Sequence, residues 1–281
     1  MSRVVTTVED LRVILGDEPP GLVPTMGALH DGHLSLIRRS TSAHATTVVS
    51  IFVNPTQFSD SADLARYPRD LAVDTARAAG EGADLIFAPT PEAIYPAGFA
   101  TSVEVAGLAD RWEGAFRSGH FRGVATVVTI LLNAVRPAAA YFGEKDYQQL
   151  VVIRRLHRDL RLPGRIVGCP TVRDADGLAL SSRNARLTPE LRAQAAASPR
   201  ALFRIAELAG RGERDVAALL DAGNAALAAA PDLSLDYLAI VDPDSLEPIA
   251  TVTPRARALI AARVGETRLI DNVELVGREG T

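Results

Sequence analysis

The stretch from residue 21 to residue 39 constrains the fold most, because its pattern changes abruptly from one type of secondary structure to another. An apolar run at residues 21–23 leads into residues 24–33 (PTMGALHDGH), and an amphipathic pattern containing Leu34 and Ile37 follows. This order predicts a strand, a glycine-containing turn and a helix. Such a turn directs backbone N–H groups and the positive end of a helix dipole at a bound anion, most often phosphate.

Two histidines, His30 and His33, lie in this turn and are separated by a glycine. We expect His33 at the start of the helix and His30 just before it, so that both rings can reach one anion. Half of a metal site and two indifferent surface residues are the alternatives. The chain has 5 His and 1 Cys, and none of the others is close in sequence, whereas zinc needs three or four ligands. A phosphate site without the P-loop sequence is therefore favoured.

Strand and helix patterns alternate along the first part of the chain. The β-branched run at residues 46–53 is typical of a strand buried in a parallel sheet. Further strands are expected at residues 83–88, 138–142 and 165–168, and helices at residues 8–15, 71–79, 123–135 and 147–159. The alternation predicts an α/β fold with a Rossmann-like parallel sheet.

The pattern changes after about residue 171. Alanine-rich helices are expected at residues 189–209 and 215–230, and strands at residues 233–241, 257–262 and 267–271. We therefore expect a nucleotide-binding domain at residues 1–170 and a smaller C-terminal α+β domain at residues 171–281.

Composition excludes several classes of protein. The net charge of −4 gives no basic signature, so no nucleic-acid partner is expected. The single Cys169 cannot form an internal disulfide, which fits a reducing compartment. The first residues show no signal-peptide pattern, and no apolar run approaches the ~18 residues of a membrane span. We expect a soluble, cytoplasmic protein without membrane contact.

Carboxamide side chains follow the strand expected at residues 46–53. Pro55 cannot continue a strand ladder, so Asn54 and Gln57 lie on the loop beyond the carboxyl end of that strand. Ligands of open α/β sheets bind at this edge. Because a carboxamide both donates and accepts hydrogen bonds, this pair suits a hydroxylated organic acid better than a bare phosphate.

Residues 143–149 (GEKDYQQ) repeat the geometry of the first turn. Gly143 ends an apolar strand, and Lys145 offers an ammonium group to a polyphosphate. Asp146 is expected to cap the following helix, and Gln149 lies one turn further on the same face. A solvated helix start with a capping aspartate is the alternative.

A third polar cluster is formed by Ser181, Ser182, Arg183 and Asn184. Two hydroxyls and a guanidinium within three positions suit a loop that binds phosphate. The alternative is an ordinary polar turn ahead of a helix that begins near residues 188–189.

Five segments together, in this order along the chain, resemble the pantothenate synthetase (pantoate–β-alanine ligase) family. They are residues 24–33, 52–58 (FVNPTQF), 119–124 (GHFRGV), 143–150 (GEKDYQQL) and 181–184 (SSRN). The His-x-Gly-His element of the first is shared with a wide nucleotidyltransferase superfamily, whereas the second and fourth are much more specific to this one family.

The resemblance implies an ATP-dependent condensation of pantoate with β-alanine to pantothenate. Pantoyl adenylate is the implied intermediate, and AMP and pyrophosphate are released. The resemblance also implies ATP as a substrate, Mg²⁺ carried on its phosphates, a homodimer, and a lid role for the second domain.

The same resemblance assigns residues to roles. The implied catalytic residues are His30, His33, Lys145 and Arg183. The implied ATP-binding residues are Met26, Gly27, Ala28, Leu29, His30, Asp31, Gly32, His33, Gly143, Glu144, Lys145, Asp146, Val172, Leu180, Ser181, Ser182 and Arg183. The implied substrate-binding residues are Gln57, Gln149 and Asn54. No residue is assigned as a direct metal ligand, and Asp74 is a possible outer partner of Mg²⁺.

Two positions depart from the family pattern. Leu180 replaces a common methionine, which is close in volume, and Asp31 replaces a frequent glutamate. No matched catalytic position is lost, so an inactive relative is not expected.

Two other functions remain as alternatives: another nucleotidyltransferase, and a non-catalytic nucleotide sensor. Gln57 and Gln149 argue against the first because they suit a small hydroxy acid. The complete set of His30, His33, Lys145 and Arg183 argues against the second.

Overall fold

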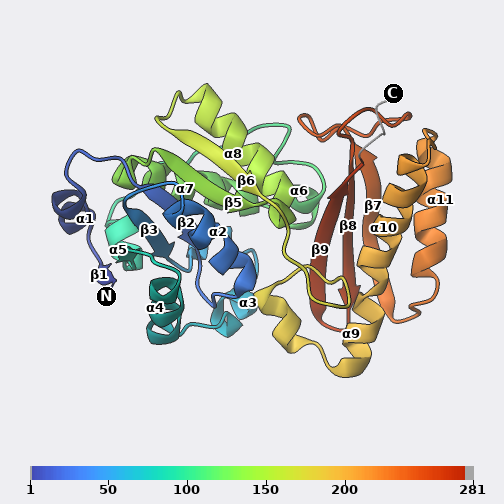
Figure 1. The fold of residues 1–281 in the computed structure, drawn as a ribbon, viewed down its shortest axis with the longest axis horizontal. Helices are drawn as coiled ribbons and strands as arrows, with labels where there is room; N and C mark the ends of the chain where they lie inside the picture. The colour runs from blue at the N-terminus through green and yellow to red at the C-terminus, as the bar shows by residue number, and fades with distance from the viewer. Residues whose placement is uncertain (1, 276–281) are drawn as a thin grey trace. The chain divides into compact units, whose positions relative to one another are not determined.

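The computed structural model describes residues 2–275. The chain forms two compact units, Met1–Pro170 and Thr171–Thr281 (Figure 1).

The first unit is built on a six-stranded parallel sheet within residues 2–170, in the order β1-β4-β3-β2-β5-β6. The predicted parallel α/β fold is confirmed, although the three-residue edge strand β1 is too short to be seen in a hydrophobic pattern. The strands are β1 (Arg3–Val5), β2 (Gly21–Thr25), β3 (Thr47–Ile51), β4 (Leu85–Phe87), β5 (Ala139–Gly143) and β6 (Arg165–Cys169).

Helices connect these strands. Those expected at residues 8–15 and 147–159 have the predicted bounds, and the one expected at residue 123 begins earlier, at His120. The helices are α1 (Val8–Leu15), α2 (Asp31–Thr41), α3 (Ser61–Arg66), α4 (Leu71–Gly80), α5 (Pro91–Ile94), α6 (Glu113–Phe116), α7 (His120–Val135) and α8 (Tyr147–Asp159), with short 3-10 turns η1 (Pro55–Gln57) and η2 (Glu144–Asp146).

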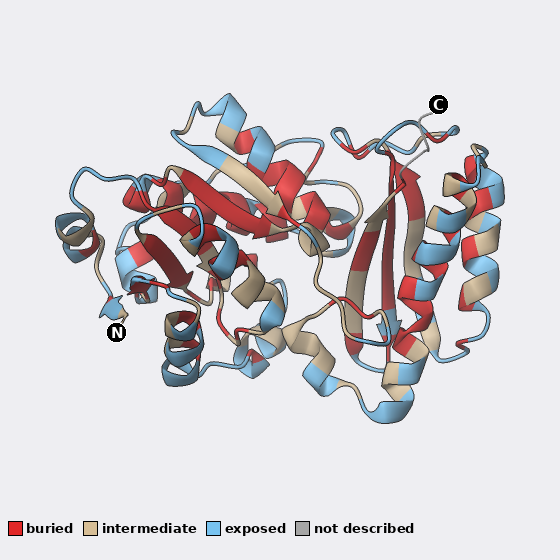
Figure 2. Cartoon of the chain, viewed as in Figure 1, coloured by how far each residue is buried: buried red, intermediate tan, exposed pale blue. Residues whose placement is uncertain are grey.

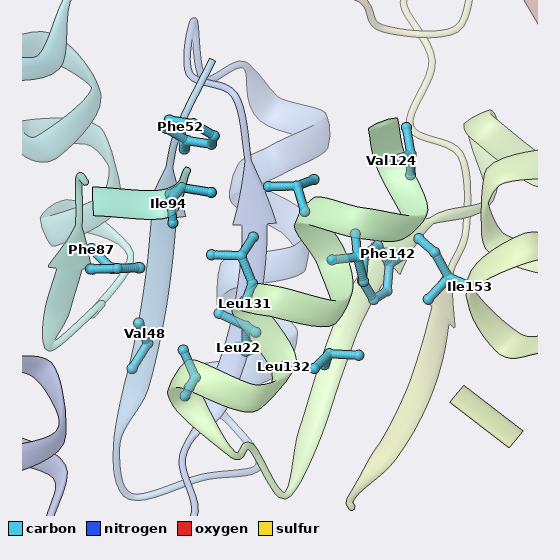
Figure 3. Packing of buried hydrophobic residues seen from close by; sticks show 14 of the residues in the cluster. Leu22, Val48, Phe52, Phe87, Ile94, Val124, Leu131, Leu132, Phe142 and Ile153 are labelled. Carbon is cyan, nitrogen blue, oxygen red and sulfur yellow. The ribbon is translucent and has the colours of Figure 1, made fainter. Parts of the chain in front are cut away.

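Alternate residues of the strands build two separate cores, one on each face of the sheet. Leu22 and Val48 pack with α7 and α8 on one face, where Leu131 and Leu132 of α7 lie over the strands (Figure 3). Val23 belongs to the core of the opposite face, which includes Leu36 and Ile37 of α2 and Ala78 of α4. Helices therefore cover both faces, and polar side chains can gather only at the sheet's edges and ends.

The strand order places a topological switch point beside β2. From β2 the chain continues to β3 on one side, and it later returns to β5 on the other. Pairing between β2 and β5 is recorded only at Gly21–Ala139 and Leu22–Ala140, while β2 and β3 pair over five positions. The carboxyl ends of β2, β3 and β5 are thus neighbours at the position where open α/β sheets bind ligands.

The second unit contains a three-stranded antiparallel sheet within residues 171–275, in the order β7-β8-β9. The predicted helix at residues 189–209 is interrupted at Ala196. The elements are η3 (Ser182–Arg186), α9 (Pro189–Ala195), α10 (Ala197–Gly210), α11 (Val216–Leu227), β7 (Leu233–Val241), β8 (Arg257–Val264) and β9 (Thr267–Glu274).

The central strand of this sheet, β8, is buried along nearly its whole length (Figure 2). On one of its faces, Ala258 and Ile260 pack in a core that includes Leu202 and Ile205 of α10 and Leu219 of α11. This small sheet with helices agrees with the expected α+β character of the C-terminal region.

Among residues 2–275, every helix is too short or too polar to cross a membrane.

Candidate active site

The loop after β2 has an unusual backbone conformation. Gly27 has φ +87° and Ala28 has φ +50°, in the left-handed region. For a residue with a Cβ, this region costs roughly 1–2 kcal/mol. A Cβ on Gly27 would also lie 2.7 Å from an oxygen of Asp74. Glycine is therefore required at position 27, and other contacts must hold Ala28 in place.

Asp74 of α4 supplies these contacts. Its Oδ2 accepts a hydrogen bond from the N–H of Ala28 at 2.8 Å, and its Oδ1 accepts one from the N–H of Leu29 at 2.7 Å. Asp74 is only 3% exposed. Arg77, one helical turn further on, donates to the carbonyl oxygen of Leu29 at 2.5 Å. The possible outer Mg²⁺ role of Asp74 stays a prediction, and the contact that the structure gives each of its oxygens is a hydrogen bond from the loop backbone.

The two histidines lie where the sequence predicts. His30 is the residue before α2, and His33 is in its first turn. The ring centroids are 4.1 Å apart, and Nδ1 of His33 accepts a hydrogen bond from the N–H of His30 at 3.3 Å. Because Nδ1 accepts, the neutral ring of His33 carries its proton on Nε2. His33 therefore presents an N–H donor beside the positive end of the helix.

Both rings are neutral at pH 7. Burial, followed by the charge of Lys145, lowers the pKa of His30 to about 4. Burial, followed by the charge of His30, lowers the pKa of His33 to about 3, and Lys145 contributes here as well. Lys145 and Asp146 follow β5 but act electrostatically on both rings, so the fold brings the two glycine-containing turns together.

Asp146 differs in detail from the prediction. It occupies the position before α8, but its side chain makes no capping hydrogen bond. Instead, its Oδ1 lies 3.5 Å from Nζ of Lys145. The carboxylate therefore orients the lysine beside the histidine pair rather than closing the helix end.

Asn54 is expected to bind substrate, but the structure gives its side chain an internal role. Its Nδ2 donates to Oε1 of Gln57 at 3.0 Å and to the carbonyl oxygen of Gly123 at 3.2 Å. Its Oδ1 accepts from the hydroxyls of Thr56 and Tyr95, at 2.9 and 2.7 Å. With 1% exposure and both polar atoms engaged, Asn54 orients Gln57.

Gln57 consequently has one end fixed and one end available. Its Oε1 is held by Asn54, whereas its Nε2 lies 3.1 Å from the sulfur of Met26. A thioether is a weak acceptor. The amide N–H groups of Gln57 thus remain as good donors for an oxygen of a ligand.

Gln148 and Gln149 are neighbours in sequence with different surroundings. Gln148 is buried, donates to the carbonyl oxygens of Leu108 and Arg111, and accepts from the N–H of Glu113. Gln149 is half-buried, and its side chain makes no hydrogen bond within residues 2–275. Gln149 is therefore the one available to a ligand. No feature of the sequence revealed the structural role of Gln148.

The serine–arginine motif lies in the second unit, where its loop is fixed at both ends. The N–H of Leu180 donates to the carbonyl oxygen of Val172 at 2.9 Å, and Asn184 Nδ2 donates to the carbonyl oxygen of Ala179 at 3.0 Å. The Ser181 hydroxyl accepts from the N–H of Arg183. The predicted helix start is confirmed, since Thr188 caps α9.

The collected groups suit an anion better than a metal ion. Within residues 2–275, no group of three or more His, Cys, Asp or Glu side chains is placed to hold a metal. Two neutral histidines, an ammonium group and two carboxamides instead combine donors for phosphate with donors for a hydroxy acid.

Comparisons with known proteins agree with this chemistry. The family model described as pantoate-beta-alanine ligase matches residues 3–274. The chain is 54% identical over 274 residues to pantothenate synthetase of Thermus thermophilus, covering 97% of this chain and 99% of that protein. It is 54% identical over 276 residues to pantothenate synthetase of Rhizorhabdus wittichii, covering 96% and 98%.

Solved structures show the same likeness. The crystal structure of pantothenate synthetase from Thermus thermophilus superposes with a TM-score of 0.95 at 53% identity, covering 98% of this chain and 99% of that one. Pantoate-beta-alanine ligase from Francisella tularensis, described as complexed with beta-gamma ATP and beta-alanine, gives a TM-score of 0.80 at 33% identity, covering 98% of both chains.

Replacing Asp74 tests the support of the loop. Asp74→Ala removes the acceptor of the buried N–H of Leu29 and of the half-buried N–H of Ala28, and a fully buried N–H left without a partner costs about 1–3 kcal/mol. We expect the free energy of unfolding to fall by about 2–4 kcal/mol and ATP binding to weaken at least tenfold, measured by urea unfolding and calorimetry. Asp70→Ala removes the cap of the same helix and is the matched control, with about 1 kcal/mol lost and ATP affinity retained. Equal ATP affinity in both variants would contradict the role of Asp74.

Acid is expected to destabilise the first unit through its histidines. The pKa values of His30 and His33 are lowered to about 4 and about 3 in the folded chain, against 6.5 for an ordinary histidine. The unfolded chain therefore binds more protons below pH 6.5, so stability is complete above that pH and is lost as the pH falls toward 4. Urea unfolding at several pH values measures this loss, and His30→Asn should make it shallower. An unchanged slope in that variant would contradict the assignment.

Proposed function

Because the chain belongs to the pantoate–β-alanine ligase family, we propose that it condenses pantoate with β-alanine to pantothenate, converting ATP to AMP and pyrophosphate. The observation that carries this proposal is the meeting of three loops at the carboxyl ends of β2, β3 and β5. These loops carry a histidine pair, a lysine and two glutamines with available amide groups at the neighbouring ends of three strands.

The first step forms a mixed anhydride. A carboxylate oxygen of pantoate bonds to the α-phosphorus of ATP, and the bond from that phosphorus to the bridging oxygen breaks to release pyrophosphate. This chemistry needs positioning and charge neutralisation rather than a protein nucleophile. We assign the Nε2–H of His33 and the Nζ of Lys145 as donors to phosphate oxygens, with His30 beside them.

The second step forms the amide. The amine of β-alanine attacks the carbonyl carbon of pantoyl adenylate, AMP leaves, and the amine loses a proton. Gln57 and Gln149 hold the pantoyl group through both steps. The fixed Oε1 of Gln57 makes that side chain a donor to an oxygen of pantoate.

Other residues complete the nucleotide site in this proposal. Residues 26–32 and Gly143, Glu144 and Asp146 line the ATP in the first unit. Leu29 shapes this loop rather than presenting a polar group, because its side chain is buried in the core and its N–H and carbonyl oxygen are bonded to Asp74 and Arg77. Val172, Leu180, Ser181, Ser182 and Arg183 of the second unit contact ATP as the family resemblance implies, and that unit serves as a lid.

We further propose that Mg²⁺ enters on the phosphates of ATP. Asp74 is turned toward the loop backbone, and Mg²⁺ characteristically uses substrate phosphates and water with few protein ligands. A homodimer and a cytoplasmic location also belong to the proposal, supported by the family resemblance and by the single buried cysteine.

A stepwise assay tests the proposed function. ATP with pantoate should yield one burst of pyrophosphate, and pantothenate and AMP should accumulate only after β-alanine is added. Pyrophosphate release that depends on a nucleotide monophosphate would indicate a different nucleotidyltransferase. ATP binding without turnover would indicate a nucleotide sensor.

Replacing His33 tests the phosphate contact. His33→Ala removes the Nε2–H donor, and we expect kcat of adenylation to fall about a hundredfold or more, because the donor acts on charge that develops in the transition state. Pyrophosphate release measures this rate. Near-wild-type adenylation would remove His33 from the mechanism.

Replacing Gln149 tests the pantoate contact. Gln149→Ala should raise KM for pantoate about tenfold and leave KM for ATP unchanged, because one ligand hydrogen bond is lost. The melting temperature should remain close to that of the wild type, since this side chain makes no hydrogen bond within the described part of the chain. An equal rise in both KM values would argue against the contact.

A further inference from the structure

The first turn of α7 holds the short turn that carries Gln57. The backbone carbonyl of Gln57 lies at the end of η1, where a helical turn leaves its acceptors without partners. The Nδ1 of His120 lies 2.8 Å from this carbonyl oxygen, and Nη2 of Arg117 lies 3.5 Å from it. Because a carbonyl only accepts, the His120 ring donates through Nδ1.

The other side of the His120 ring is also specified. Its Nε2 lies 3.3 Å from Nη1 of Arg117, and a guanidinium only donates, so Nε2 is the acceptor. Burial, followed by the charge of Arg117, lowers the pKa of His120 to about 4, which keeps the ring neutral at pH 7. The ring therefore has one tautomer, with its proton directed at the backbone of Gln57.

Gly123, one turn further along α7, brings the helix directly against η1. A Cβ at this position would lie 2.5 Å from the carbonyl oxygen of Thr56 and 2.7 Å from the backbone nitrogen of Gln57. These are backbone atoms, so the turn itself would have to move. The carbonyl oxygen of Gly123 also accepts from Asn54, which holds the side-chain oxygen of Gln57.

We propose that His120 and Gly123 are positioning residues that fix the backbone of Gln57 and thereby set how tightly its amide binds the hydroxy acid. This inference rests on the proposed function of Gln57. It also gives a role to residues within the segment 119–124. That segment resembles the family, but the resemblance assigned no function to its residues. Neither residue needs to touch substrate, since both act through the turn at residues 55–57.

Two replacements of His120 separate positioning from simple packing. The amide nitrogen of His120→Asn sits near the position of ring Nδ1 and keeps the donor, whereas that of His120→Gln reaches toward the position of Nε2 and loses it. We expect His120→Gln to raise KM for pantoate about tenfold. KM for ATP should stay unchanged, and His120→Asn should recover most of the pantoate affinity.

A matched control uses another histidine. His157 of α8 also faces a backbone carbonyl, that of Pro163 at 3.2 Å, but it lies at the end of α8 remote from its first turn. His157→Gln should leave both KM values unchanged. Gly123→Ala should raise KM for pantoate, while Gly210→Ala, where a Cβ meets nothing within 4 Å, should not.

The outcomes distinguish this inference from the proposed function. An inactive wild type would overturn the proposed function itself. An active wild type with unchanged pantoate KM in both His120→Gln and Gly123→Ala would overturn the positioning role alone. Equal losses for ATP and pantoate, or no recovery in His120→Asn, would show that His120 only stabilises the fold. If His120→Gln does not fold, the pantoate KM of Gly123→Ala against Gly210→Ala decides.

Discussion

The site depends on one buried carboxylate that holds a strained backbone. Asp74 accepts the N–H groups of Ala28 and Leu29 while Ala28 keeps a left-handed conformation that its Cβ disfavours. Without this pair of hydrogen bonds we expect the loop backbone to relax. His30, which directly follows Leu29, would then shift with it. The positions of both imidazoles thus follow from an aspartate on a different helix.

The carboxamide side chains of the site are of two kinds: some are hydrogen-bonded inside the protein, and others have donors that remain available to a ligand. Asn54 and Gln148 use their hydrogen-bonding capacity inside the protein. Gln57 keeps an N–H donor facing only a thioether, and Gln149 has no internal partner within residues 2–275. Buried carboxamides therefore fix the geometry, and their neighbours meet the ligand, so that little reorganisation is needed when substrate binds.

Local patterns in the sequence predicted the fold and the histidine turn. The alternation of strands and helices indicated the parallel α/β fold, and the turn at residues 24–33 placed His30 and His33 correctly at the start of α2. The supporting contacts could not be predicted, because they join residues far apart in the chain: Asp74 bonds to Ala28, and His120 to Gln57. One clue was available, since Asp74 lies four residues before the buried Ala78, on the inner face of α4, where an unpaired charge is costly. The neighbouring glutamines 148 and 149 carried no such clue.

A crystal structure of the protein with a non-hydrolysable ATP analogue and pantoate tests the central claim most directly. The account predicts phosphate oxygens within hydrogen-bond distance of Nε2 of His33 and Nζ of Lys145, and pantoate on Nε2 of Gln57 and the amide of Gln149. The bonds from Asp74 to the loop should remain intact. Phosphates bound away from the histidine pair, or an acid that contacts neither glutamine, would contradict it.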